Sequence, residues 1–263
     1  MHWMTLLNLL LIALIVVVLP IVELPAIGRL KRFTSSALRI SILRGATFKL
    51  WLCAIAVVAL AYPHNLVVLP RTAADIGWLL THPAVRIGAI AMICAYSLLA
   101  IVPGLQCALD ATMRARNAKA FRTLQFMLPV ATAERRLWCL VSVTAGVCEE
   151  LVFRGYLIRF FHGQLDGALS LSLTAAWLLS SLAFGFGHVY QGAAGIVSTT
   201  IGGLLLGLLA ILTGNLILPI LLHVLLDLQT LWMYRPRIDH PEHAERLVQG
   251  CEGLPAVQAV ANG

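Results

Sequence analysis

Long apolar runs separated by short polar segments dominate the pattern of this chain. About seven of them are long enough to form spans, at 4–28, 50–69, 86–107, 137–160, 167–187, 193–213 and 215–233. A helix of roughly 20 predominantly apolar residues crosses the ~30 Å hydrocarbon core of a bilayer. Backbone polar groups in lipid must be satisfied internally, which favours helices. The pattern therefore predicts an all-α fold, a polytopic transmembrane helix bundle of about seven spans.

The composition of the chain agrees with a membrane protein. The 263 residues are 60% hydrophobic and 12% charged, with a mean hydropathy of +0.88, which is unlike a typical soluble domain. The first apolar run lacks a basic leading region and a small-residue cleavage site. We therefore expect it to be a retained span and not a cleaved signal peptide.

The basic residues indicate a membrane topology. The chain has a net charge of +7, and its basic residues cluster in the segments that connect the apolar runs and not on one face of a folded domain. We therefore expect no nucleic-acid partner. With seven spans, the positive-inside rule then places the N-terminus outside and the C-terminus in the cytoplasm. We expect a multi-pass protein of a bacterial cytoplasmic membrane, because the chain is compact. The clusters are Arg29, Lys31, Arg32, Arg39, Arg44 and Lys49; then Arg114, Arg116, Lys119, Arg122, Arg135 and Arg136; and finally Arg235, Arg237 and Arg246.

Two further segments carry structural expectations. Segment 29–49 mixes basic and apolar residues, which fits either a helix lying on an anionic leaflet or a solvated basic loop. Gly203 and Gly207 form a GxxxG spacing, and Ser198 and Gly202 form a second pair of small residues. This spacing predicts close packing of the sixth span against a neighbouring helix.

The span at 137–160 contains charged residues whose insertion into lipid is unfavourable. Each ionised side chain at mid-membrane costs about 2.5 to 3.5 kcal/mol on insertion scales. Glu150 and Arg154 are separated by four residues, so on a helix they can form an ion pair on one face. Glu149 lies about 100° around the helix, without a partner there. Glu149 is therefore the better catalytic candidate, while the alternative is a polar network that only fixes helix packing.

Two more spans carry isolated polar groups. His188 ends the fifth span, and His223 and Asp227 lie four residues apart on the seventh. One such histidine is commonly a satisfied core residue, but polar groups on three helices favour a shared cavity. A carboxylate in an apolar pocket can act as a general base toward water. Histidines can donate to an oxyanion or carry protons, so the combination predicts amide hydrolysis.

These residues resemble a known family. "EELVFR" at 149–154 matches an EExxxR motif, "FGFGH" at 184–188 an FxxxH motif, and "HVLLD" at 223–227 an HxxxN/D motif. Their order resembles that of the CAAX-protease and bacteriocin-processing (CPBP, Abi-type) intramembrane endopeptidases. On this basis we expect a three-span region at 1–136, a catalytic helical core at 137–233 and a polar tail at 234–263.

The resemblance implies an intramembrane glutamic-type endopeptidase that cuts a membrane-associated or lipidated peptide. It implies that Glu149 activates water, that His188 assists, and that His223 and Asp227 stabilise the oxyanion. The supporting residues would be Glu150, Arg154 and Phe184. Asp227 departs from the family pattern because asparagine is common there, and an ionised aspartate cannot donate. We expect Asp227 to accept from His223 and fix its tautomer; the other reading is a protonated Asp227.

Other functions fit parts of the pattern. Glu149, His188, His223 and Asp227 could bind Zn²⁺, which would make a metalloprotease, although we expect no cofactor. Cys148 could be a nucleophile, but no base is evident on its own helix face. The six cysteines form no CxxC pair. A non-catalytic peptide-binding or immunity protein could use the same cavity, and so could a proton-coupled transporter, although no inverted repeat is visible.

Overall fold

The computed structural model describes residues 3–32, 35–61, 65–69, 82–118, 124, 126–166 and 171–235. Lys119 and Arg122 of the predicted basic loop, and Arg237, Arg246 and the rest of the tail from 236 onward, lie outside these residues. Within them the secondary structure is helical, apart from one isolated bridge between Val68 and Asn215. The predicted all-α class is confirmed.

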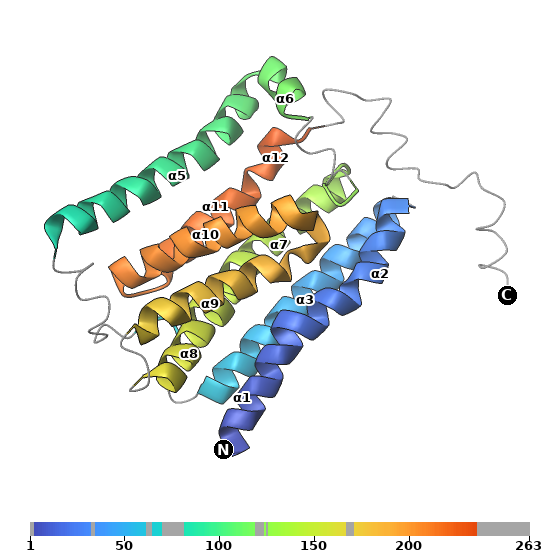
Figure 1. The fold of residues 1–263 in the computed structure, drawn as a ribbon. Coiled ribbons are helices and arrows are strands. Elements are labelled where there is room, and N and C mark those ends of the chain that lie inside the picture. The colour runs from blue at the N-terminus through green and yellow to red at the C-terminus, as the bar shows by residue number, and fades with distance from the viewer. Residues whose placement is uncertain are drawn as a thin grey trace, which may run out of the picture.

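Among the described residues of the N-terminal half are three long helices. The first is continuous and consists of α1 (Trp3–Ala13), a π-helical segment η1 (Leu14–Val18) and α2 (Leu19–Arg32). It is followed by α3 (Ser36–Ala61), α5 (Pro83–Leu109) and the short α6 (Ala111–Ala118). Figure 1 shows α1, α2 and α3 along one side of the bundle and α5 along the other.

The C-terminal half lies between these outer helices (Figure 1). One continuous helix contains α7 (Thr132–Glu149), the π-helical segment η3 (Glu150–Leu157) and α8 (Ile158–Leu165). It is followed by α9 (Ser172–Gly187), a 3₁₀ turn η4 (Val189–Gln191) and α10 (Gly192–Thr213). The described chain ends with α11 (Ile217–Leu228) and α12 (Thr230–Met233).

Several of these helices are suited to a bilayer. By length and composition, Trp3–Arg32, Ser36–Ala61, Pro83–Leu109 and Val189–Thr213 can each cross a membrane, and Ser172–Gly187 and Ile217–Met233 are shorter apolar helices. Large apolar side chains on the outer helices are exposed, among them Leu10, Ile55 and Leu99. Such an exposed apolar surface belongs in lipid. The chain is therefore a membrane protein.

The predicted boundaries of the second span were wrong. The helix runs from Ser36 to Ala61 and not from 50 to 69, so residues 36–49 are the first turns of this long helix and not a separate surface helix or loop. Near its N-terminal end Arg39, 1% exposed, donates to Glu134 of α7 at 3.1 Å from Nε and 3.0 Å from Nη2. The Arg39 charge thus stabilises a contact inside the bundle.

Small residues let the central helices approach closely, as the GxxxG spacing predicted. A Cβ built on Gly207 of α10 would lie 2.7 Å from the Trp177 ring, and one on Gly203 would lie 3.1 Å from Phe184. On α7, a Cβ at Gly146 would meet the Val224 backbone nitrogen of α11 at 3.1 Å. These contacts place α10 against α9 and α11 against α7, and they fix the distances between the polar groups on these helices.

Candidate active site

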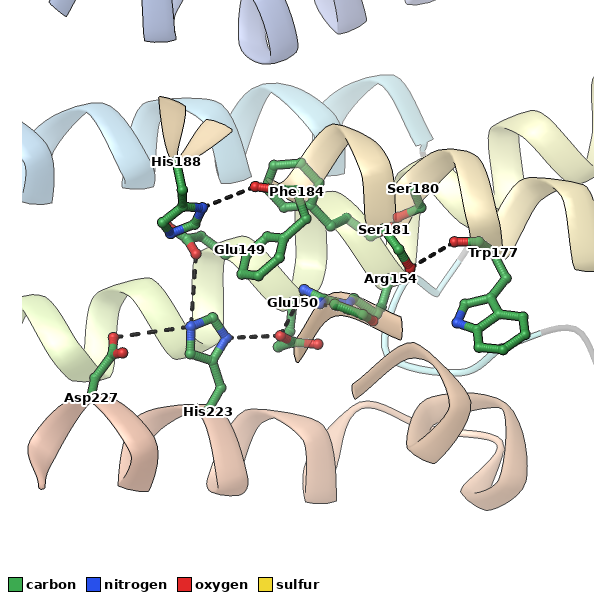
Figure 2. A network of polar contacts seen from close by, with 12 residues as sticks. Glu149, Glu150, Arg154, Trp177, Ser180, Ser181, Phe184, His188, His223 and Asp227 are labelled. Carbon is green, nitrogen blue, oxygen red and sulfur yellow. Dashed lines mark hydrogen bonds and ion pairs between the residues drawn. The ribbon is translucent and has the colours of Figure 1, made fainter. Parts of the chain in front are cut away.

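The three sequence motifs meet at one cavity. Glu149 is the last residue of α7, His188 follows α9, and His223 lies on α11. Figure 2 shows the side chains of Glu149 and His188 close to His223, from three different elements. All three residues and Asp227 line a cavity of about 340 Å³. The structure therefore brings together the four residues predicted for the site.

Glu149 and Glu150 face different surroundings although they are adjacent. The α-helical geometry of α7 ends at Glu149, and the wider π-helical turns begin at Glu150. The Glu149 side chain is 17% exposed, and its Oε2 lies 3.7 Å from Nε2 of His223. The Glu150 side chain is completely buried. Glu149 is thus the glutamate that the cavity exposes.

Glu150 forms the predicted ion pair. Arg154 Nη1 donates to Glu150 Oε1 at 2.9 Å, and both side chains are at most 1% exposed. Arg154 Nη2 also donates to the Gly203 carbonyl oxygen at 3.3 Å, and its guanidinium lies 4.3 Å from the Phe184 ring centroid. A buried charge must be paired and hydrogen-bonded to be tolerated. These contacts explain how the bundle accommodates Glu150 and Arg154.

The residue that orients His223 is Glu150 and not Asp227, which corrects the expectation from the sequence. His223 Nδ1 donates to Glu150 Oε1 at 2.8 Å. Asp227 Oδ2 is 4.0 Å from Nε2 of the same ring, beyond hydrogen-bonding distance. The four-residue spacing brings Asp227 near, but α7 supplies a closer acceptor. Nε2 of His223 therefore faces the cavity between Glu149 and Asp227.

His188 is fixed in the same manner by its own motif. Its Nδ1 donates to the Phe184 carbonyl oxygen at 2.9 Å, one helical turn earlier. The Phe184 ring packs against both imidazoles, with centroids 4.8 Å from His188 and 5.8 Å from His223. Because a backbone carbonyl only accepts, Nδ1 carries the proton and Nε2 is the available nitrogen. Phe184 thus lies beside the site, as the motif indicated.

The N-terminal helices form a large part of the cavity wall, which the sequence analysis did not anticipate. The apolar lining from α2 and α3 includes Ile27, Leu30, Ile42 and Leu43. An ion pair between Lys49 and Glu23 joins these two helices at the cavity. A signal for this pair existed, because both charges stand next to apolar runs. Tyr190 and Gln191 also line the cavity and were not singled out.

The structure also bears on the cysteine and zinc alternatives. The Cys148 side chain is fully buried and is not part of the cavity lining, which makes it unavailable to a substrate there. Within the described ranges, no group of three or more His, Cys, Asp or Glu side chains is arranged to hold a metal ion. The metal content of the purified protein would test the zinc alternative directly.

Comparison with known proteins agrees with the motifs. Residues 132–229, which run from α7 to the end of α11, match the family described as Rce1-like, type II CAAX prenyl endopeptidase Rce1-like. The resemblance inferred from the three motifs is confirmed for this segment. No curated protein and no solved structure matches the chain. The matched family is described as one of endopeptidases, and the matched segment contains every residue predicted for the site.

Proposed function

We propose that this protein is an intramembrane endopeptidase in which Glu149 activates a water molecule for attack on a peptide bond. The observation that carries the proposal is the meeting of Glu149 with two imidazoles, His188 and His223, at one cavity in a helix bundle. Each imidazole is fixed by a hydrogen bond through Nδ1. Such an arrangement keeps a base and proton carriers in place before substrate binds.

The proposed reaction follows from the groups at the cavity. A water molecule loses a proton to the Glu149 carboxylate while its oxygen bonds to the substrate carbonyl carbon, which forms a tetrahedral oxyanion. The carbon–nitrogen bond then breaks, and the leaving nitrogen takes up the proton, returned by Glu149 directly or through Nε2 of His188. One product has a new carboxylic acid, which loses its proton to the solvent or to the new amine, and the other product has that amine. Glu149 and His188 return to their starting protonation states.

The remaining polar residues would support this chemistry. Glu150 holds the His223 ring, and Arg154 compensates the buried Glu150 carboxylate through their ion pair. His223, when protonated at Nε2, would donate to the oxyanion. Asp227 lies 4.0 Å from that nitrogen and would stabilise the imidazolium. These roles are carried over from the family resemblance and from the distances at the site.

The substrate we propose is a membrane-associated peptide or protein with a lipidated or strongly apolar segment near the cleaved bond. The lining contributed by α2 and α3 is largely apolar, which suits an acyl or prenyl chain. The matched family is named a CAAX prenyl endopeptidase, and this name supports the same class of lipidated substrate. We further propose the topology with the N-terminus outside and the C-terminus in the cytoplasm.

The test compares the termini of membrane proteins in cells that produce the wild-type chain, E149A or the control D166N. Asp166 is an exposed carboxylate after α8, so its loss leaves the cavity unchanged. Wild type and D166N should generate a common set of new C-termini that E149A does not generate at equal expression. Identical termini in cells with wild type and with E149A would overturn the proposal.

A further inference from the structure

The hydrogen-bond donors of the proposed site are few. A tetrahedral oxyanion is stabilised by donors aimed at the oxygen as its charge develops. His188 uses its Nδ1 proton on the Phe184 carbonyl oxygen, and His223 uses its own on Glu150. Each imidazole therefore offers the cavity only Nε2, and a neutral ring that is protonated at Nδ1 has no proton there.

The acidic residues do not supply the missing donor. Nε2 of His223 lies 3.7 Å from Glu149 and 4.0 Å from Asp227, and ionised carboxylates only accept hydrogen bonds. The motif that resembles HxxxN/D ends here in Asp227, where an asparagine would offer an amide N–H. The protonated His223 can then provide one donor. Compared with a site that has asparagine at this position, the cavity is one donor short.

Tyr190 is well placed to supply that donor. It lies two residues after His188 in the η4 turn and lines the same cavity. The Tyr190 and His188 ring centroids are 5.9 Å apart. Gln191 Nε2 donates to the Tyr190 hydroxyl oxygen at 3.1 Å. Because the hydroxyl accepts from Gln191, its own proton must point in another direction and is available to a ligand.

The η4 turn that carries Tyr190 is fixed from both sides. It is followed by Gly192, whose φ of +80° is a conformation that side chains disfavour. Gln191 packs directly over Gly195, where an added Cβ would be 2.2 Å from the Gln191 Cβ. From α2, Lys31 Nζ donates to the Tyr190 carbonyl oxygen at 3.4 Å. The backbone of the turn that carries Tyr190 is therefore fixed before a substrate arrives.

We infer that the Tyr190 hydroxyl is a second oxyanion donor, oriented by Gln191, and that it replaces the amide donor that Asp227 cannot provide. This inference rests on the proposed peptidase function. The hydroxyl would donate to the oxygen of the scissile carbonyl as water adds to the carbon. A phenol remains protonated across the working pH range of most enzymes, so it is a donor whatever the protonation state of the histidines.

The first test measures kcat and KM of the full-length Y190F variant on a prenylated CAAX peptide. Loss of one oxyanion donor lowers kcat by about 10²- to 10³-fold, and KM should stay within about threefold because the donor acts on the transition state. The control is Y96F, which removes a hydroxyl from a half-buried tyrosine on α5 that packs against the core and does not line the cavity. A kcat for Y190F within threefold of wild type would overturn the inference.

A second test separates a donor from a structural role. In the D227N background an amide N–H becomes available, so the additional loss from Y190F should fall to about tenfold or less. A residue that only maintains the fold would cause the same loss in both backgrounds, and equal losses would therefore overturn the inference.

The parallel E149Q measurement distinguishes the two proposals. If E149Q is inactive while Y190F equals wild type, only the Tyr190 inference fails. If E149Q retains full activity, the proposed function fails, and the Tyr190 inference fails with it.

Discussion

His223 donates from Nδ1 to Oε1 of Glu150 at 2.8 Å, which joins α11 to the π-helical segment that begins after Glu149. The same Oε1 accepts from Arg154 at 2.9 Å. One buried carboxylate oxygen thus receives both a guanidinium and an imidazole. This sharing connects the charge that the bundle must neutralise with the ring that faces the cavity, and it makes Glu150 a positioning residue for His223.

Removal of Arg154 should destabilise the bundle strongly. The R154M variant keeps an apolar side chain of similar length but leaves Glu150 buried without its cation. Breaking a buried ion pair from one side costs about 3–5 kcal/mol, so the free energy of unfolding should fall by that amount. Denaturant unfolding in detergent micelles measures it. The control R116M removes an exposed arginine and should change the value by less than about 0.5 kcal/mol.

An equal stability of R154M and R116M would contradict this account of the ion pair. It would mean that the buried Glu150 carboxyl does not depend on the Arg154 cation.

Gly185 should be intolerant of any side chain. An added Cβ would lie 1.8 Å from Thr200 Oγ1 and 2.9 Å from the Ile196 carbonyl oxygen of α10. Because Gly185 precedes His188 by three residues, relief of this clash must shift the end of α9 and the His188 ring. We expect G185A to lose at least about tenfold in kcat/KM. The matched control is G163A on α8, where nothing lies within 4 Å; G163A should keep full activity, and equal activity of the two variants would refute the close approach.

Much of this arrangement could be predicted from the sequence because it is local or periodic. The apolar runs predicted the helices, and the four-residue spacing predicted the ion pair between Glu150 and Arg154. Contacts between distant segments could not be read in the same way. The Arg39–Glu134 pair joins residues 95 apart, so the sequence did not show that the basic segment 29–49, which contains Arg39, includes the start of a long helix packed on α7.

The prediction that Asp227 fixes the tautomer of His223 was wrong for a similar reason. Asp227 is four residues away on the same helix, whereas Glu150 is 73 residues away and reaches the ring only through the packing of α7 against α11. Hydrophobic periodicity also cannot reveal a change from α-helical to π-helical turns at Glu150. The position of α2 and α3 along the cavity likewise depends on tertiary packing.

Removal of metal should leave the activity unchanged if a carboxylate alone activates the water. We expect the purified wild-type protein, treated with a strong chelator and verified by elemental analysis to lack zinc, to retain its kcat on a prenylated CAAX peptide. Treated but re-metallated protein is the control for damage by the chelator. Activity that is lost on chelation and restored by Zn²⁺ would favour the metalloprotease alternative instead.

The central claim is that the Glu149 carboxylate is the base that activates water, and the most direct measurement is kcat of purified, metal-free E149Q beside the wild type. Glutamine keeps the size of the side chain and removes its basicity. General-base catalysis contributes about 10²- to 10⁴-fold, so kcat should fall at least that far while the unfolding transition stays close to that of the wild type. A correctly folded E149Q with kcat within threefold of wild type would contradict the account.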